Sequence, residues 1–198
     1  FDTARPYHGG TSESALKQCL TSRYPRESYV LADKLSGGFE KEEEIRPLID
    51  LMLEKCGVEY FDNYLIHNIN ADFYAKAKQL HTFEFIQKMK DAGLCRRTGI
   101  SFHGTPDLLE DLLKHYPEID LVQLQLNYAD WDDAGVQSRR LYEICMEHGK
   151  SVLVMEPVKG GNLANLPEAA ATLLKEAHAD WSQARWAISF AASLPGVY

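Results

Sequence analysis

The stretch 29–67, YVLADKLSGGFEKEEEIRPLIDLMLEKCGVEYFDNYLIH, has the pattern of a strand, a helix and a second strand. Apolar runs end at Lys34 and at His67. Between them, apolar residues recur at the i, i+3, i+4 spacing of an amphipathic helix, with Glu and Lys on its other face. The strand runs are almost entirely apolar, which is typical of a parallel sheet covered on both faces. The stretch therefore predicts parallel strands joined by a right-handed helical crossover.

The same strand-and-helix unit recurs along the chain. Each predicted strand is separated from the next by enough residues for one helix. The predicted strands cover 1–4, 29–34, 61–67, 98–102, 121–127 and 151–156, and another begins at Val197. The predicted helices cover 43–56, 83–90, 106–113 and 137–148.

A doubly wound sheet and an eight-fold barrel are the two folds built from such repeats. The doubly wound reading is weakened because the glycine pairs Gly9-Gly10, Gly37-Gly38 and Gly160-Gly161 lack the third glycine of the dinucleotide fingerprint. Functional-looking residues follow several strands, which favours the barrel. We therefore predict a single (β/α)8 TIM-barrel domain over residues 1–198. It is incomplete, covering strands 2 to 7 and the start of strand 8, with the first unit expected before Phe1 and the rest of the barrel after Tyr198.

The composition narrows the class of partner. The chain has 198 residues, 45 % of them hydrophobic, and a formal net charge of −8 without a Lys/Arg cluster. This argues against nucleic acids and anionic membranes, which require a positive face, and favours a small-molecule substrate. No apolar run is long enough to span a membrane. The four cysteines are scattered without a Cys-x-x-Cys pair, so no metal site or disulfide framework is predicted. A reducing, cytoplasmic location fits best.

Four polar residues stand at or just after the ends of predicted strands: Asp2, Tyr7, Lys34 and His67. The carboxyl ends of barrel strands carry the chemistry, so these side chains are expected to converge. A tyrosine is a weak acid, and a neighbouring lysine ammonium makes its proton easier to release. An aspartate paired with that lysine keeps the ammonium charged, and a histidine can hydrogen-bond a substrate oxygen. Such a set can protonate an alkoxide as hydride reaches the carbon.

The run Phe-Asp2-Thr-Ala-x-x-Tyr7, followed by Lys34 and His67 in the same order and strand context, resembles the aldo-keto reductase family. The resemblance continues through Gly-Ile-Ser101, Val-Gln123 and Met155-Glu-Pro. It implies an NAD(P)H-dependent oxidoreductase that reduces an aldehyde or ketone to an alcohol. In that reaction Tyr7 would be the general acid, assisted by Lys34, Asp2 and His67.

The same resemblance implies a cofactor site and a substrate pocket. NADP (NADPH) is the expected cofactor, with Ser101 and Gln123 holding its carboxamide and Met155 beside its ring. The sequence departs from the family at three positions, because Phe102 stands where Asn is frequent, Met155 where an aromatic ring is common and Asn68 where many members have Trp. The residues expected to line the substrate pocket are Asn68, Phe102 and Trp131. His103 is left open between the pocket and the surface.

Three further interpretations are considered for this chain. The runs 122–131 and 154–161 resemble a bacterial branch whose members carry a ferredoxin-like iron–sulfur region after the barrel. A 4Fe–4S cluster is therefore expected only beyond Tyr198. A non-enzymatic, nicotinamide-binding regulatory protein on the same fold is the alternative to an enzyme. An unrelated barrel that binds phosphate esters would need a glycine-rich phosphate grip after the last strands, which these residues do not reach.

Overall fold

The structure is a computed structural model that describes residues 1–198. The chain folds as two compact units. The first contains Phe1–Gly104 and Leu112–Leu121, and the second contains Thr105–Asp111 and Val122–Tyr198. Helix α5 (Pro106–His115) contributes residues to both.

Three parallel strands form the sheet of the first unit: β1 (Ala32–Leu35), β2 (Phe61–Ile69) and β3 (Cys95–Phe102). Lys34 pairs with Leu65, and Leu65 pairs with Gly99. Only glycine fits at position 99, because a Cβ there would lie 2.5 Å from Leu65 Cδ2 and 2.6 Å from the carbonyl oxygen of Leu121. The apolar side chains of this sheet thus pack too closely for any larger residue there.

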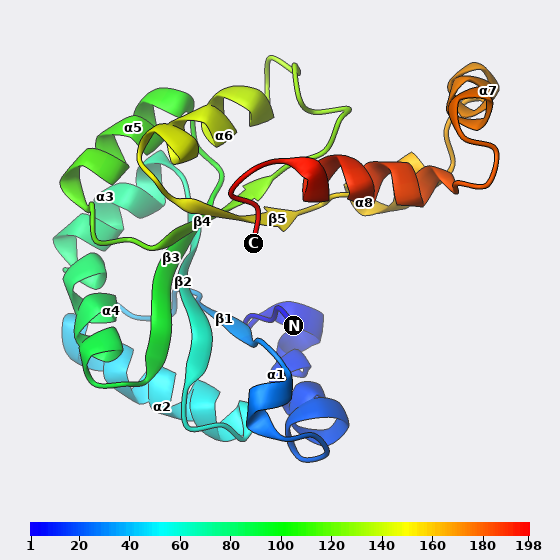
Figure 1. Cartoon of the computed structure of the whole chain (residues 1–198). Helices are drawn as coiled ribbons and strands as arrows, with labels where there is room; N and C mark the ends of the chain where they lie inside the picture. The colour runs from blue at the N-terminus through cyan, green and yellow to red at the C-terminus, as the bar shows by residue number, and fades with distance from the viewer. The chain divides into compact units, whose positions relative to one another are not determined.

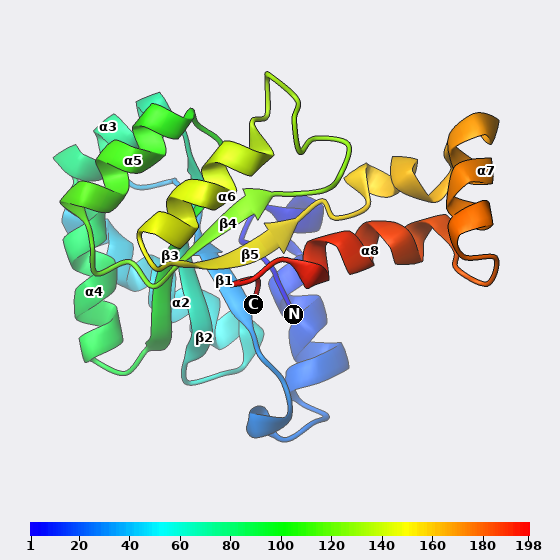
Figure 2. The ribbon, with the colours of Figure 1, turned by 45° about the horizontal axis from the view of Figure 1, so that its top comes forward.

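The first unit also contains the helices α1 (Ser12–Leu16), α2 (Ile45–Cys56), α3 (Ala71–Gln79) and α4 (Thr82–Asp91), with a π-helical turn at Lys17–Thr21. Figures 1 and 2 show α2, α3 and α4 covering one side of the sheet. These three helices turn buried apolar residues toward the strands, at an expected gain of about 1.5–3 kcal/mol per large side chain. The core on this side contains Ile45, Ile49, Met52, Phe61, Tyr64, Phe83, Ile86 and Met89.

Local signals in the sequence set the ends of two helices. Helix α2 stops at Gly57, which adopts the left-handed conformation (φ 66°) and closes the last turn through its N–H. Helix α3 starts at Asn70, whose side-chain oxygen accepts hydrogen bonds from the N–H groups of Asp72 and Phe73, both at 3.1 Å. An N-cap of this kind stabilises a helix by about 1 kcal/mol.

The second unit contains β4 (Leu121–Gln125, whose first residue belongs to the first unit), β5 (Ser151–Met155), α6 (Ser138–Glu147), a 3-10 segment at Lys159–Ala164, α7 (Glu168–Ala177) and α8 (Gln183–Ser193). The two strands are neighbours, and the N–H of Leu126 donates to the carbonyl of Met155 at 3.1 Å. Figure 2 shows α6 lying over β4 and β5. After α8 the chain returns to β5, where Val197 forms an isolated parallel bridge with Val152.

The predicted strand 1–4 is wrong as a strand. Only Asp2 bridges Ala32, through hydrogen bonds between Ala32 N–H and Phe1 O (2.8 Å) and between Thr3 N–H and Ala32 O (3.0 Å). The chain then enters the tight turn Tyr7–Gly10, so no longer ladder can form. The four predicted helices are confirmed, with ends that shift by a few residues. No helix combines the length and apolar character that crossing a membrane requires.

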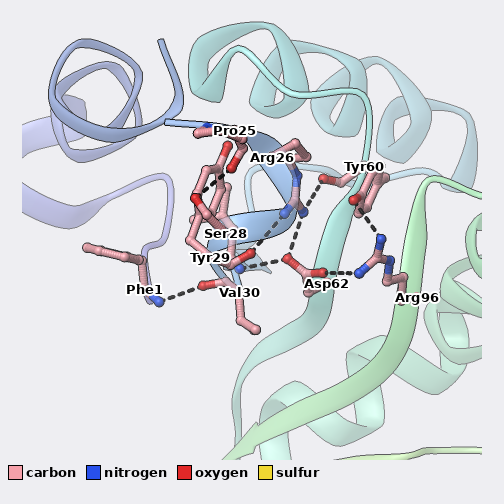
Figure 3. Close-up of polar contacts among 10 residues, drawn as sticks. Phe1, Pro25, Arg26, Ser28, Tyr29, Val30, Tyr60, Asp62 and Arg96 are labelled. Carbon is pink, nitrogen blue, oxygen red and sulfur yellow. Dashed lines mark hydrogen bonds and ion pairs between the residues drawn. The ribbon is translucent and has the colours of Figure 1, made fainter. Parts of the chain in front are cut away.

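A polar cluster joins the strands of the first unit near their amino ends (Figure 3). Asp62, near the start of β2, accepts hydrogen bonds from Arg26 Nη2 (2.7 Å), Arg96 Nη1 (2.9 Å) and the N–H of Leu31 (2.8 Å). Both guanidinium groups also lie over the ring of Tyr60, at 4.0 and 4.5 Å from its centroid. The cluster ties β2 to β3 and to the segment before β1.

Candidate active site

Lys34 is the centre of a polar cluster at the carboxyl end of β1. Its side chain is fully buried, and its Nζ donates to Asp2 Oδ2 at 2.5 Å, to the carbonyl oxygen of Thr3 at 3.0 Å and to Tyr7 OH at 3.3 Å. A buried ammonium needs such partners to remain charged. The three acceptors account for its three hydrogens.

The backbone around the bridge explains how Asp2 and Tyr7 reach Lys34. Asp2 is bridged to Ala32, which lies two residues before Lys34 in β1. The N–H of Tyr7 then bonds to the carbonyl of Ala4 at 3.0 Å, which folds the chain back and directs the half-buried phenol toward the ammonium. The Nζ of Lys34 also lies 4.8 Å from the centre of the Tyr7 ring.

His67 lies near the carboxyl end of β2 and completes the predicted set. Its ring meets the Tyr7 ring edge to face, with centroids 5.7 Å apart and an interplanar angle of 78°. Burial, the charge of Lys34 and the proximity of His103 together lower the pKa of His67 from 6.5 to about 4, against the opposing effect of Asp2. The imidazole is therefore neutral at pH 7. The structure thus brings together all four residues that the sequence predicted to converge.

Ser36, which the sequence analysis did not single out, contacts His67. Its Oγ lies 2.6 Å from His67 Nδ1 and 3.1 Å from the carbonyl oxygen of Lys34. The register of β1 and β2, which pairs Leu35 with Ile66, puts Ser36 next to His67. A pattern of apolar residues carries no signal for such a contact, because it depends on the register between two strands.

A second acidic cluster, also missed, lies beside Asp33. The buried side chains of Glu13, Asp33 and Cys56 have polar atoms within 4.8 Å of one another. Burial raises the pKa of Asp33 from 3.8 to about 7, although the N–H of Lys34 donates to its carboxylate at 2.7 Å. Burial also raises the pKa of Glu13 and that of Cys56, whose thiol donates to Asp33 at 3.6 Å. The strict alternation of side chains in a strand could have located this cluster, because Asp33 must leave β1 on the face opposite Lys34.

The end of β3 supplies one predicted cofactor residue. Ser101 is buried, and its Oγ lies 3.3 Å from His103 Nε2, so the two side chains share a face of the strand. Phe102 lies between them and is only 2 % exposed, on the opposite face. The substrate contact of Phe102 stays a prediction. Asn68 is half-buried, with a left-handed backbone (φ 58°) inside an irregularity of the β2–β3 pairing.

The remaining predicted residues belong to the second unit. Gln123 is buried in β4, and Met155 is partly exposed at the end of β5. Trp131 packs against Tyr142 of α6 and Phe190 of α8, at centroid distances of 5.7 and 5.4 Å. Trp131 thus contributes to the packing of the second unit through these aromatic contacts.

The second unit also holds a polar network that the sequence analysis did not predict. Asp130 is buried and accepts hydrogen bonds from Gln125 (2.8 Å) and Asn127 (2.7 Å), and it forms an ion pair with Lys159. Hydrogen bonds from Lys159, Gln125 and Asn127 lower the pKa of Asp130, against the effect of its burial. Asn127 also donates to the carbonyl of Glu156 at 3.1 Å, so the network fixes the loop after β4 to the segment after β5.

A hollow of about 580 Å³ in the second unit lies between α7 and α8. Its walls are mostly apolar side chains, including Leu166, Leu173, Trp181, Trp186 and Phe190. None of the predicted site residues lines it, so its volume does not bear on the chemistry of Tyr7 and Lys34.

Comparison with known proteins identifies what the chain is similar to. The model of the Aldo/keto reductase family matches residues 1–197. The NAD(P)H-dependent D-xylose reductase of Pyricularia oryzae is 29 % identical over 146 residues, covering 63 % of this chain and 43 % of the relative. The NADH-specific methylglyoxal reductase of Escherichia coli is 25 % identical over 182 residues, covering 82 % of this chain and 53 % of the relative. The chain thus spans about half the length of these two relatives.

Solved structures confirm the fold class. An aldo/keto reductase from Klebsiella pneumoniae, in complex with NADP and acetate, matches with a TM-score of 0.76 and 20 % identity, covering 99 % of this chain and 66 % of that one. At this identity the likeness bears on the fold alone. It confirms the predicted barrel class, to which the parallel strands and covering helices described above correspond.

Proposed function

Because the chain belongs to the aldo/keto reductase family, we propose that its protein is an NAD(P)H-dependent oxidoreductase that reduces an aldehyde or ketone to an alcohol. The observation that carries the proposal is the contact of the Lys34 ammonium with Tyr7 OH at 3.3 Å and with Asp2 at 2.5 Å. Carbonyl reduction needs a proton donor beside the reacting oxygen, and a phenol next to a buried cation is suited to that task.

Tyr7 is the proposed general acid. Its phenol would donate a proton to the carbonyl oxygen as negative charge develops there. The ammonium of Lys34, 3.3 Å away, stabilises the phenolate that remains. Asp2 keeps that ammonium charged and holds it in position.

His67 is the proposed second contact of the carbonyl oxygen. Its imidazole is neutral because burial and the Lys34 charge lower its pKa to about 4. A neutral imidazole carries one N–H, which can donate to the oxygen without competing with Tyr7 as an acid. The site would thus combine one transferable proton with one fixed hydrogen-bond donor.

The proposed cofactor residues are Ser101, Gln123 and Met155. A nicotinamide, when bound, supplies the hydride for the carbonyl carbon. Ser101, in the first unit, and Gln123, in the second, are buried polar side chains, and each offers a group that can hydrogen-bond a carboxamide. Met155 offers a partly exposed thioether suited to the face of a ring. NADPH rather than NADH stays a prediction, as do substrate contacts by Asn68 and Trp131. The iron–sulfur region beyond Tyr198 also stays a prediction.

The test is reduction of aldehydes, ketones and quinones by the full protein with NADPH and with NADH, in wild type and in Tyr7→Phe. The variant keeps the ring and loses only the transferable proton, so carbonyl reduction should fall by roughly 10²–10⁴-fold, while cofactor affinity changes little. Tyr24→Phe is the matched control, since Tyr24 is 56 % exposed and is not among the three hydrogen-bond partners of the Lys34 ammonium. Quinones are left out of the comparison, because some accept hydride without this proton.

A Tyr7→Phe variant that reduces its best aldehyde or ketone at the wild-type rate would contradict the assignment of the acid. A wild-type protein that binds NADPH or NADH but reduces none of the carbonyls would instead support the non-enzymatic, nicotinamide-binding alternative.

A further inference from the structure

The side chains of Ser36 and His67 are in contact, and together they have only two polar hydrogens. Ser36 directly follows β1, and its Oγ lies 2.6 Å from Nδ1 of His67 and 3.1 Å from the carbonyl oxygen of Lys34. A serine hydroxyl has one hydrogen, and a neutral imidazole has one N–H that can sit on either ring nitrogen. His67 is neutral at pH 7 for the reasons given above. The direction of the contact therefore decides which nitrogen of His67 carries the hydrogen.

Two arrangements satisfy this count. If Ser36 donates to Nδ1, the imidazole hydrogen must be on Nε2. If Ser36 donates to the carbonyl of Lys34, Nδ1 carries the hydrogen, donates to Ser36 Oγ and leaves Nε2 with only a lone pair. The second arrangement needs an N–H···O bond of 2.6 Å and an O–H···O bond of 3.1 Å. Both lie outside the usual ranges of about 2.7–3.2 Å and about 2.5–3.0 Å. The shorter of the two Ser36 contacts is the one to Nδ1, so we assign the hydroxyl hydrogen to it.

We propose that Ser36 is a positioning residue, which donates its hydroxyl hydrogen to Nδ1 of His67 and so keeps the hydrogen of the imidazole on Nε2. This inference rests on the proposed function. A carbonyl oxygen only accepts hydrogen bonds, so it needs the N–H on the nitrogen that Ser36 leaves free. With the opposite tautomer, a lone pair would face the oxygen at which negative charge develops.

The role is testable because removing the hydroxyl frees the tautomer without removing the imidazole. Ser36→Ala should lower kcat/KM for carbonyl reduction by roughly 3- to 10-fold, the factor typical of one neutral hydrogen bond. Ser36→Thr keeps a hydroxyl and should restore most of the rate. Ser28→Ala is the control, because Ser28 also bonds a backbone carbonyl (Pro25, 2.7 Å) but lies before β1.

The first experiment reads the tautomer directly, by nitrogen NMR of the full protein labelled with 15N-histidine. The chemical shifts of the two His67 nitrogens are expected to assign the hydrogen to Nε2 in wild type, in Ser36→Thr and in Ser28→Ala. They should show a tautomer mixture in Ser36→Ala. A wild-type His67 with its hydrogen on Nδ1, or no change in Ser36→Ala, would overturn the proposal.

The second experiment is a double-mutant cycle. In a His67→Ala background, Ser36→Ala should cause no further loss of kcat/KM, because its effect acts through the imidazole. An equal loss in both backgrounds would show that Ser36 acts through the structure in general, and would overturn the proposal. Failure of the proposed function is distinguishable from these outcomes. A wild-type protein that reduces no carbonyl contradicts the function, whereas the NMR experiment requires no turnover and still decides what Ser36 does to His67.

Discussion

Asp33 and Lys34 are adjacent in β1, and their side chains leave the strand into two different environments. The Lys34 ammonium contacts Asp2, Thr3 and Tyr7. The Asp33 carboxyl lies instead beside Glu13 and Cys56, where burial raises its pKa to about 7. The two groups remain linked through the backbone, because the N–H of Lys34 donates to Asp33. Ion pairing thus holds the side chain of Lys34 on one face of the strand. The buried carboxyl of Asp33 holds its backbone N–H from the other face.

The Asp33 environment predicts an unusual dependence of stability on pH. The folded protein binds the Asp33 proton up to about pH 7, whereas the unfolded chain loses it near pH 3.8. The stabilising contribution is therefore complete below the unfolded pKa and is lost as the pH rises toward 7, at about 1.4 kcal/mol per pH unit within that window. Asp33→Asn keeps the acceptor for the Lys34 N–H and removes the titration. We expect the variant to gain unfolding free energy relative to wild type between pH 5 and pH 8, measured by urea denaturation at both values.

The comparison must be made between the two proteins at each pH, because His67 acts in the opposite direction. Its folded pKa of about 4 lies below its unfolded value of 6.5, so its contribution is present above pH 6.5 and is lost as the pH falls toward 4. This contribution is common to wild type and variant and cancels in their difference. A difference in unfolding free energy that stays constant from pH 5 to pH 8 would contradict the assigned state of Asp33.

Lys34→Met should separate catalysis from stability. We expect carbonyl reduction to fall by at least roughly 10²-fold, because the phenolate left after proton transfer would lose the neighbouring cation that stabilises it. The loss in unfolding free energy should stay below the roughly 3–5 kcal/mol of a stranded buried charge, since the Asp2 side chain is 39 % exposed and reaches solvent. Steady-state kinetics and thermal unfolding would measure the two effects. Lys88→Met, at a 64 % exposed side chain, is the control and should change neither.

Gly99→Ala should destabilise the sheet of the first unit. The added methyl group would lie 2.5 Å from Leu65 Cδ2 and 2.6 Å from a backbone carbonyl that cannot move aside easily. Overpacking of this kind costs about 1–3 kcal/mol. Gly135→Ala is the matched control, because its Cβ would meet only the Asp133 carboxylate, at 3.2 Å. Equal denaturation midpoints for the two variants would show that β3 has more space than the structure indicates.

Patterns in the sequence predicted the helices and strands whose buried residues recur at a regular spacing. Helix α2 was predictable because its buried residues, from Ile45 to Cys56, follow the period of a helix. The convergence of Asp2, Tyr7, Lys34 and His67 was also predictable, since parallel strands bring their carboxyl ends together. By contrast, the run 1–4 has a strand-like composition, but the turn at Tyr7 allows only one bridge to Ala32.

Other parts of the site depend on register and direction, which composition does not specify. The Ser36–His67 contact follows from the pairing of Leu35 with Ile66, a relationship between two strands rather than within one. The face that Phe102 occupies also depends on direction, because Ser101 and His103 share the opposite face of β3. Alternation is visible in the sequence once the strand and the face of one residue are known. The Asp33 cluster could have been found in the same way.

The cluster around Asp62 should support stability without contributing to the chemistry. Asp62→Ala removes the carboxylate that Arg26, Arg96 and the Leu31 N–H share, and it leaves the largely buried Arg26 guanidinium without its ion-pair partner (Figure 3). We expect a loss of about 2–4 kcal/mol in unfolding free energy. The kcat for carbonyl reduction should stay near wild type, because Asp62 lies at the start of β2 and His67 near its end. Asp50→Ala breaks the exposed Arg46–Asp50 pair and should cost no more than about 1 kcal/mol. Similar losses in the two variants, measured by chemical denaturation, would mean that the Asp62 cluster is no more than a surface ion pair.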